Sequence, residues 1–154
     1  MKRSSAWTRV QVLVGIAVSA AAPDALALNN CLPGDFVDRR GLADLRIAND
    51  DPGNAFRYRP RCVTLSEGTR VQFSALPNFG MHPLFGGTVS AGQAMIDPDS
   101  PIGAITMGET VERLLVGIGE WPFFCDVHFQ QGMQGSIRVV PELFADGFDG
   151  SPAP

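Results

Sequence analysis

Hydrophobic and polar residues alternate with a period of two along most of the chain, which is the pattern of strands with one buried face. In the segment 69–75, Val71 and Phe73 alternate with the polar Arg70 and Gln72. Short segments of this kind predict an all-β protein built as an antiparallel β-sandwich. Further inward-facing residues are expected at Leu114, Val116 and Ile118, at Trp121, Phe123 and Cys125, and at Ile137 and Val139.

Turn-forming residues separate these segments. The 154 residues include 17 glycines and 12 prolines, which favours many turns and short strands over long helices. Only the segments 42–47 and 92–96 suggest a helix of one or two turns. The segment 142–154, rich in Gly, Asp and Pro, is expected to form a loose tail. We therefore expect a single domain over 28–141.

The first 27 residues have the pattern of a secretory signal peptide. Lys2, Arg3 and Arg9 accompany an apolar run over 10–22, and Ala27 completes an Ala-x-Ala cleavage pattern. The apolar run is shorter than the about 20 residues that a membrane-spanning helix needs, although a retained membrane anchor is the alternative. The pattern predicts cleavage after Ala27 and export to the periplasm.

The charge balance excludes one broad class of partner. The formal net charge is −4 and the pI is about 5.0, which argues against a protein that binds nucleic-acid phosphates. An acidic surface fits a basic docking partner, and it fits simple solubility equally well.

The three cysteines leave one thiol unpaired if the other two form a disulfide. Export to an oxidising compartment permits disulfides. Cys31 and Cys62 lie among polar and turn-forming residues in the N-terminal half, whereas Cys125 lies in an aromatic strand. The most economical prediction is a Cys31–Cys62 disulfide and a free thiol at Cys125.

A thiol, an imidazole and a thioether lie within one short segment. Cys125, His128 and Met133 have the spacing Cys-x2-His-x4-Met, and the other histidine of the chain is His82. Together they form the donor set of a mononuclear blue-copper site. Taken singly, the residues also suit a buried free cysteine, a loop methionine and a surface histidine. Zinc could use the thiolate and imidazoles, but its structural sites prefer a stronger fourth ligand than methionine.

The sequence resembles the small cupredoxins of the plastocyanin and pseudoazurin type. The resemblance is carried by the segment 58–84, which contains Tyr-x-Pro-x-Cys and His-Pro-Leu, and by 121–141 with the Cys-x2-His-x4-Met spacing. It implies a Greek-key β-sandwich that binds one type 1 copper ion. The ligands that it implies are His82, Cys125, His128 and Met133.

We also expect Asn78, Pro83 and Val127 to surround these ligands. In the family that the chain resembles, a backbone N–H after the first histidine donates to the cysteine sulfur. Pro83 stands at that position here and has no N–H. We therefore expect the N–H of Val127, at a position where the family has proline, to supply this hydrogen bond and to tune the reduction potential.

The resemblance further implies that His128 lies near the surface and is the point where electrons leave. An apolar patch around it would dock redox partners transiently. For the two phenylalanines of that patch, packing into the core is the alternative. The patch is expected to comprise Met81, Leu84, Phe85, Phe129 and Gly132.

These observations predict a soluble exported electron carrier that cycles between Cu(I) and Cu(II). It would be a monomer that meets a donor and an acceptor protein, and it would not be an enzyme. The alternative is a copper-trafficking or copper-resistance protein, although the methionines are scattered rather than clustered. A copper oxidase or nitrite reductase needs more histidines than the two present, and an intact ligand set argues against a metal-free module.

Overall fold

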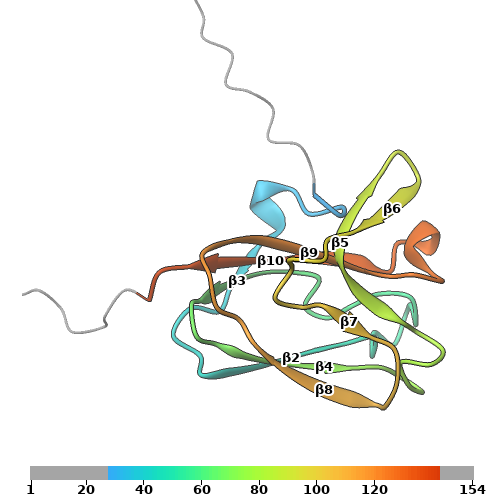
Figure 1. Cartoon of the computed structure of the whole chain (residues 1–154), viewed down its shortest axis with the longest axis horizontal. Coiled ribbons are helices and arrows are strands. Elements are labelled where there is room, and N and C mark those ends of the chain that lie inside the picture. Colours follow the sequence, from blue (N-terminus) through green and yellow to red (C-terminus); the bar gives the residue numbers. More distant parts are fainter. Residues whose placement is uncertain (1–27, 143–154) are drawn as a thin grey trace, which may run out of the picture.

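The computed structural model describes residues 28–142, and nearly all of their regular structure is β-strand (Figure 1). The predicted signal peptide lies outside the described residues, as does the predicted tail apart from Glu142. Within the described part, no helix is long and apolar enough to cross a membrane. The elements are η1 (Pro33–Asp35), β1 (Val37–Asp38), β2 (Asp44–Ala48), β3 (Cys62–Ser66), β4 (Arg70–Ser74), β5 (Leu84–Ser90), β6 (Gln93–Ile96), β7 (Ala104–Ile105), β8 (Thr110–Leu114), β9 (Gly119–Cys125), η2 (Phe129–Gln131) and β10 (Gln134–Val140).

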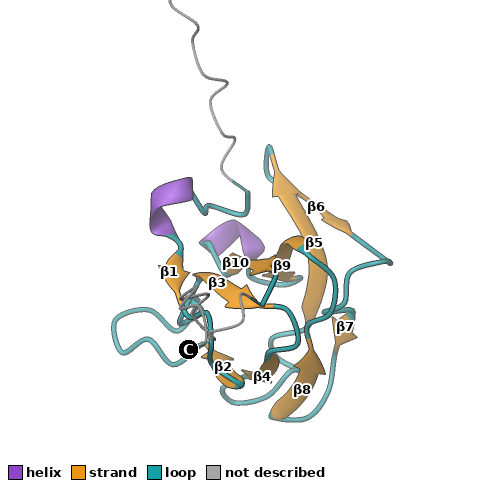
Figure 2. Cartoon of the chain, turned by 90° about the vertical axis from the view of Figure 1, so that its left-hand side faces the viewer, coloured by secondary structure: helices purple, strands orange, loops and turns teal. Residues whose placement is uncertain are grey.

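Two sheets face each other as a sandwich (Figure 2). The larger sheet has the order β1-β3-β10-β9-β5-β6 with β7 paired to β5, and the smaller has the order β2-β4-β8. The predicted β-sandwich is confirmed, but its sheets are mixed: β1–β3, β3–β10 and β2–β4 pair in parallel. Because β3 crosses to the opposite sheet between β2 and β4, the latter two run in the same direction.

The inward faces of both sheets form one hydrophobic core, as the alternation predicts. Val71 and Phe73 of β4 are fully buried, and so are Phe123 and Cys125 of β9 and Ile137 of β10. Burying an aliphatic or aromatic side chain of this size stabilises the fold by about 1.5–3 kcal/mol. Cys125, at the end of β9, is therefore held between the two sheets as part of this core.

The prediction for the segment around β8 is wrong by one residue. Leu114, Val116 and Ile118 are all more than half exposed, and Leu115 is the buried residue. The N–H of Leu115 donates to the carbonyl of Thr69, which turns its side chain into the core. A shift of one residue exchanges the two faces of a strand, so all three residues predicted to face the core face solvent instead.

The two segments predicted as short helices are strands. The segment 42–47 contributes to β2, which pairs along its whole length with β4. The segment 92–96 contributes β6, which pairs with β5 after a turn in which Ala91 and Gly92 both have positive φ angles. Pairing with a neighbouring strand outweighs the weak local preference for helix in both segments.

The predicted disulfide is confirmed. Cys31 and Cys62 are bonded, and Cys125 is a buried free thiol. The bridge ties the segment before β1 to the first residue of β3. The N-terminal segment of the described chain is thereby held against the larger sheet.

Candidate metal centre

The strand register brings the two histidines together with the free cysteine. Cys125 is the last residue of β9, and it lies opposite Leu84, the first residue of β5. His82 precedes Leu84 by two residues, so the pairing of β5 with β9 places it beside Cys125. His128 and Met133 lie in the connection between β9 and β10, at the end of the sandwich that carries η2.

A tight turn holds the backbone of His82. The carbonyl of Asn78 accepts from the N–H of His82 at 3.1 Å, and the Asn78 side-chain oxygen accepts from the N–H of Met81 at 3.1 Å. Asparagine commonly closes turns in this way because its side chain can bond the backbone a few residues ahead. Asn78 therefore holds the backbone on which His82 stands.

The connection from Cys125 to Met133 is closed by its own backbone. The N–H of Cys125 donates to the carbonyl of Met133 at 2.9 Å, and the N–H of Met133 donates to the carbonyl of His128 at 3.1 Å. Gly132 has a φ of 91°, in a region that residues with a side chain rarely adopt. These bonds help to set the positions of the three predicted ligands in this connection.

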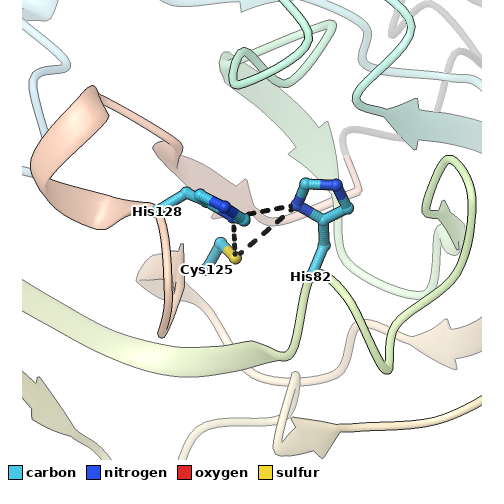
Figure 3. A group of neighbouring side chains, drawn as sticks. All are labelled: His82, Cys125 and His128. Carbon is cyan, nitrogen blue, oxygen red and sulfur yellow. Dashed lines mark hydrogen bonds between the residues drawn. The ribbon is translucent and has the colours of Figure 1, made fainter.

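Three side-chain donor atoms converge at this point (Figure 3). The Nδ1 atoms of His82 and His128 are 3.1 Å apart, and the Cys125 sulfur lies 4.0 Å from the first and 3.5 Å from the second. Bonds from a divalent metal ion to nitrogen and sulfur are about 2.0–2.3 Å, so donors on one ion lie within about 4.4 Å of each other. The three atoms fit a single ion of this kind.

Met133 belongs to the same loop, and its backbone carbonyl accepts from the N–H of Cys125. Its side chain is fully buried and belongs to the core cluster that also contains Cys125. A thioether is a weak, polarisable donor that suits copper better than zinc. Its buried position is consistent with the predicted role as a fourth, weak ligand.

The surroundings hold the imidazole neutral and the thiol protonated until a metal binds. Burial lowers the pKa of His82, His128 lowers it further, and the Leu76 backbone carbonyl raises it. Burial raises the pKa of Cys125, whereas the backbone N–H groups of Val127 and His128 lower it. A metal ion must therefore displace the thiol proton, which makes metal binding dependent on pH.

Pro83 and Val127 occupy the two positions at which the chain departs from the family pattern. Pro83 has no N–H, and its carbonyl instead accepts from the N–H of Asp126 at 2.9 Å, which links the His82 turn to the Cys125 loop. The Val127 N–H acts on the Cys125 sulfur in the direction that favours the thiolate. The hydrogen bond from this N–H to the sulfur stays a prediction.

The predicted docking patch is only partly at the surface. Met81 is 59% exposed, and Phe85, Phe129 and Gly132 are half-buried. Leu84 is fully buried, so its assignment to the patch is wrong. It lies opposite Cys125 in the register of β5 with β9, and its side chain packs in the hydrophobic core.

Phe56 is the residue at this site that the sequence did not suggest. Its ring stacks on His128, with centroids 4.5 Å apart and planes inclined by 25°, and its centroid lies 6.2 Å from that of His82. Phe56 lies in the loop between β2 and β3 and is 37% exposed. Phe56 and Tyr58 alternate with arginines in the sequence, which suggests a strand face and gives no sign of a contact with His128.

A β-sandwich that brings one thiolate and two imidazoles together, beside a buried methionine, has the donor set of a mononuclear blue-copper centre. Comparison with known proteins gives the same class. Plastocyanin A/B of Petroselinum crispum is 30% identical over 101 residues, which cover 63% of this chain and 99% of that protein. The chain therefore belongs to the cupredoxin family, with plastocyanin as its relative. Copper is accordingly its cofactor, and copper-dependent electron transfer is the activity of the family.

Solved structures similar to the chain include a plastocyanin and an auracyanin. Plastocyanin of Dryopteris crassirhizoma shares 14% identity over 62% of this chain and 100% of that one, with a TM-score of 0.42. Auracyanin of Roseiflexus castenholzii shares 19% identity over 65% of this chain and 98% of that one, with a TM-score of 0.45. No family model matches the sequence.

Proposed function

We propose that this protein is an exported electron carrier with one type 1 copper ion held by His82, Cys125, His128 and Met133. The observation that carries the proposal is the convergence of one sulfur and two nitrogen atoms within 4.0 Å of one another. A copper ion bound there would supply one-electron chemistry between Cu(I) and Cu(II). The chain's own part is to fix the donor atoms in a closed loop and a tight turn, so that little rearrangement accompanies the change of charge.

The count of histidines supports a carrier rather than an enzyme. The whole sequence contains two histidines, and both lie in the proposed ligand set. A second, catalytic copper would need further imidazole ligands. The protein would therefore pass electrons between partners without a substrate of its own.

The proposed location is the periplasm, reached through a signal peptide over residues 1–27. The disulfide between Cys31 and Cys62 supports an oxidising compartment, because such bonds rarely persist where thiols are kept reduced. The cleaved protein would consist of one cupredoxin domain over 28–141 and the C-terminal segment 142–154.

Addition of Cu(II) to the purified protein tests the proposal. We expect an intense blue colour with one copper per chain, bleached by ascorbate and restored by ferricyanide. A colourless protein that binds Cu(I) alone would indicate copper trafficking instead. A protein that binds no copper would contradict both functions.

Partners would dock on an apolar surface over His128. We assign to this surface Phe56, which stacks on His128, together with Met81 and Val127, each of which adjoins one of the two histidines in sequence. These three residues are exposed at 37%, 59% and 58%, and Phe129 is half-buried. Apolar side chains around a single redox centre suit a small interface that forms and dissociates quickly. The occupant would be the apolar face of a donor or acceptor protein.

Replacing Met81 with lysine should slow electron self-exchange between the oxidised and reduced protein at least tenfold, about 1.4 kcal/mol. Two copies that meet at this surface would bring like charges together, which is unfavourable. NMR line broadening in mixtures of the two forms measures the rate. Met95→Lys is the matched control, since Met95 is 62% exposed on β6, outside this surface. An equal effect of both variants would refute the proposed location of the contact.

A further inference from the structure

Two asparagines of this protein are buried and bonded in the same way. Asn49 is 3% exposed and Asn29 is 1% exposed. The side-chain amide of each donates to two backbone carbonyls, and its oxygen accepts one backbone N–H at 2.7 Å. Buried polar groups that are fully bonded in this way hold separate backbone segments in one arrangement. The two residues differ in which segments they hold.

The first segment that Asn49 binds is the one at Leu76, which leads into the turn that carries His82. The Asn49 side-chain oxygen accepts from the N–H of Leu76 at 2.7 Å, and its amide donates to the carbonyl of Leu76 at 3.0 Å. Leu76 leads through Pro77 into that turn, where the carbonyl of Asn78 accepts from the N–H of His82 at 3.1 Å. Asn49 thus bonds both backbone polar groups of Leu76, one in each of two successive peptide units, just before the turn that carries His82.

The second segment that Asn49 binds is the loop that carries Phe56. The Asn49 amide donates to the carbonyl of Ala55 at 3.2 Å, one residue before the ring that stacks on His128. The base of this loop is closed by two hydrogen bonds between Ala48 and Arg59. Asn49 sits just inside that closure and sets the position of Phe56 over the imidazole.

We propose that Asn49 is a positioning residue that joins the supports of both histidine ligands, through Leu76 for His82 and through Ala55 and Phe56 for His128. The inference rests on the proposed copper site. It extends that site to a residue that touches neither the metal ligands nor the surface. The two histidines, 46 residues apart in sequence, would then be held in register by a single side chain.

The wild-type protein permits a first test without any substitution. Because coupling between two sites is reciprocal, copper binding should in turn stabilise the bonds of Asn49. Hydrogen exchange by NMR on the metal-free and the diamagnetic Cu(I) protein measures this at the Leu76 amide. The Val89 amide is the internal control, since it donates to the Asn29 oxygen at the same 2.7 Å. We expect protection of Leu76 to rise at least about tenfold more than that of Val89.

A matched pair of variants gives the second test. Asn49→Ser and Asn29→Ser each remove three bonds from a buried site, and both should lower the melting temperature. Asn49→Ser alone should release copper to a chelator about 10- to 100-fold faster and shift the EPR spectrum of the Cu(II) protein. Asn29→Ser should leave the EPR spectrum and the release rate close to wild type.

The outcomes separate this inference from the proposed function. A wild-type protein that forms no blue complex would overturn the copper site and the inference with it. If the wild-type protein is blue but Asn49→Ser and Asn29→Ser release copper equally fast, the inference alone is overturned. Asn49 would then stabilise the fold without positioning the histidines. If Asn49→Ser does not fold, equal protection of the Leu76 and Val89 amides upon copper binding would overturn it.

Discussion

Replacing Cys125 with serine should abolish the blue colour and should weaken copper binding by more than the about 10- to 100-fold that loss of an outer support costs. The sulfur is the soft anionic donor of the set, and the intense colour requires a copper–thiolate bond. A serine hydroxyl at the same position stays protonated and binds copper weakly. Visible absorption and metal analysis after dialysis measure the two effects.

The small change in side-chain volume makes this substitution a clean probe of the site. Cys125 is fully buried at the end of β9, so the variant should fold, at a cost of about 1–3 kcal/mol for a buried hydroxyl. The melting temperature of the metal-free variant, compared with metal-free wild type, reports that cost separately. Retention of the blue colour in a folded Cys125→Ser protein would show that another residue is the thiolate ligand, and the assignment would fail.

The part of the site that the sequence predicts best is the part that is contiguous. Cys125, His128 and Met133 lie in one loop, and their spacing alone constrains where the side chains can meet. His82 is joined to them as the other histidine of the chain, on its chemistry and not on its position, since its place depends on the register between β5 and β9. The sandwich itself follows from the alternation, because period-two burial is a local property of each strand.

The rest depends on contacts that have no local signature. Phe56 and Asn49 meet the site because the loop between β2 and β3 closes through Ala48 and Arg59, and no periodicity encodes that closure. The error at Leu84 has a different origin. The expectation placed it at the surface with Met81, whereas its pairing with Cys125 in the register of β5 with β9 puts its side chain in the core.

Removal of the disulfide, by changing both Cys31 and Cys62 to serine, should lower the free energy of unfolding by about 3–4 kcal/mol. The bond closes a loop of 31 residues, and the chain-entropy relation gives this value for a loop of that length. The loss is a large share of the about 5–15 kcal/mol by which native domains are stable. Guanidinium unfolding of the metal-free wild type and variant measures it.

The same variant separates the stability of the fold from the geometry of the site. The bridge joins the N-terminal segment to the start of β3, whereas the donor atoms are held by the His82 turn and the loop after β9. At low temperature the folded variant should therefore still turn blue with Cu(II), and bound copper should recover part of the lost stability because it binds only the folded state. An unchanged unfolding free energy would mean that the bridge does not constrain the unfolded chain. A folded variant that stays colourless would mean that β3 positions the ligands as well as the core.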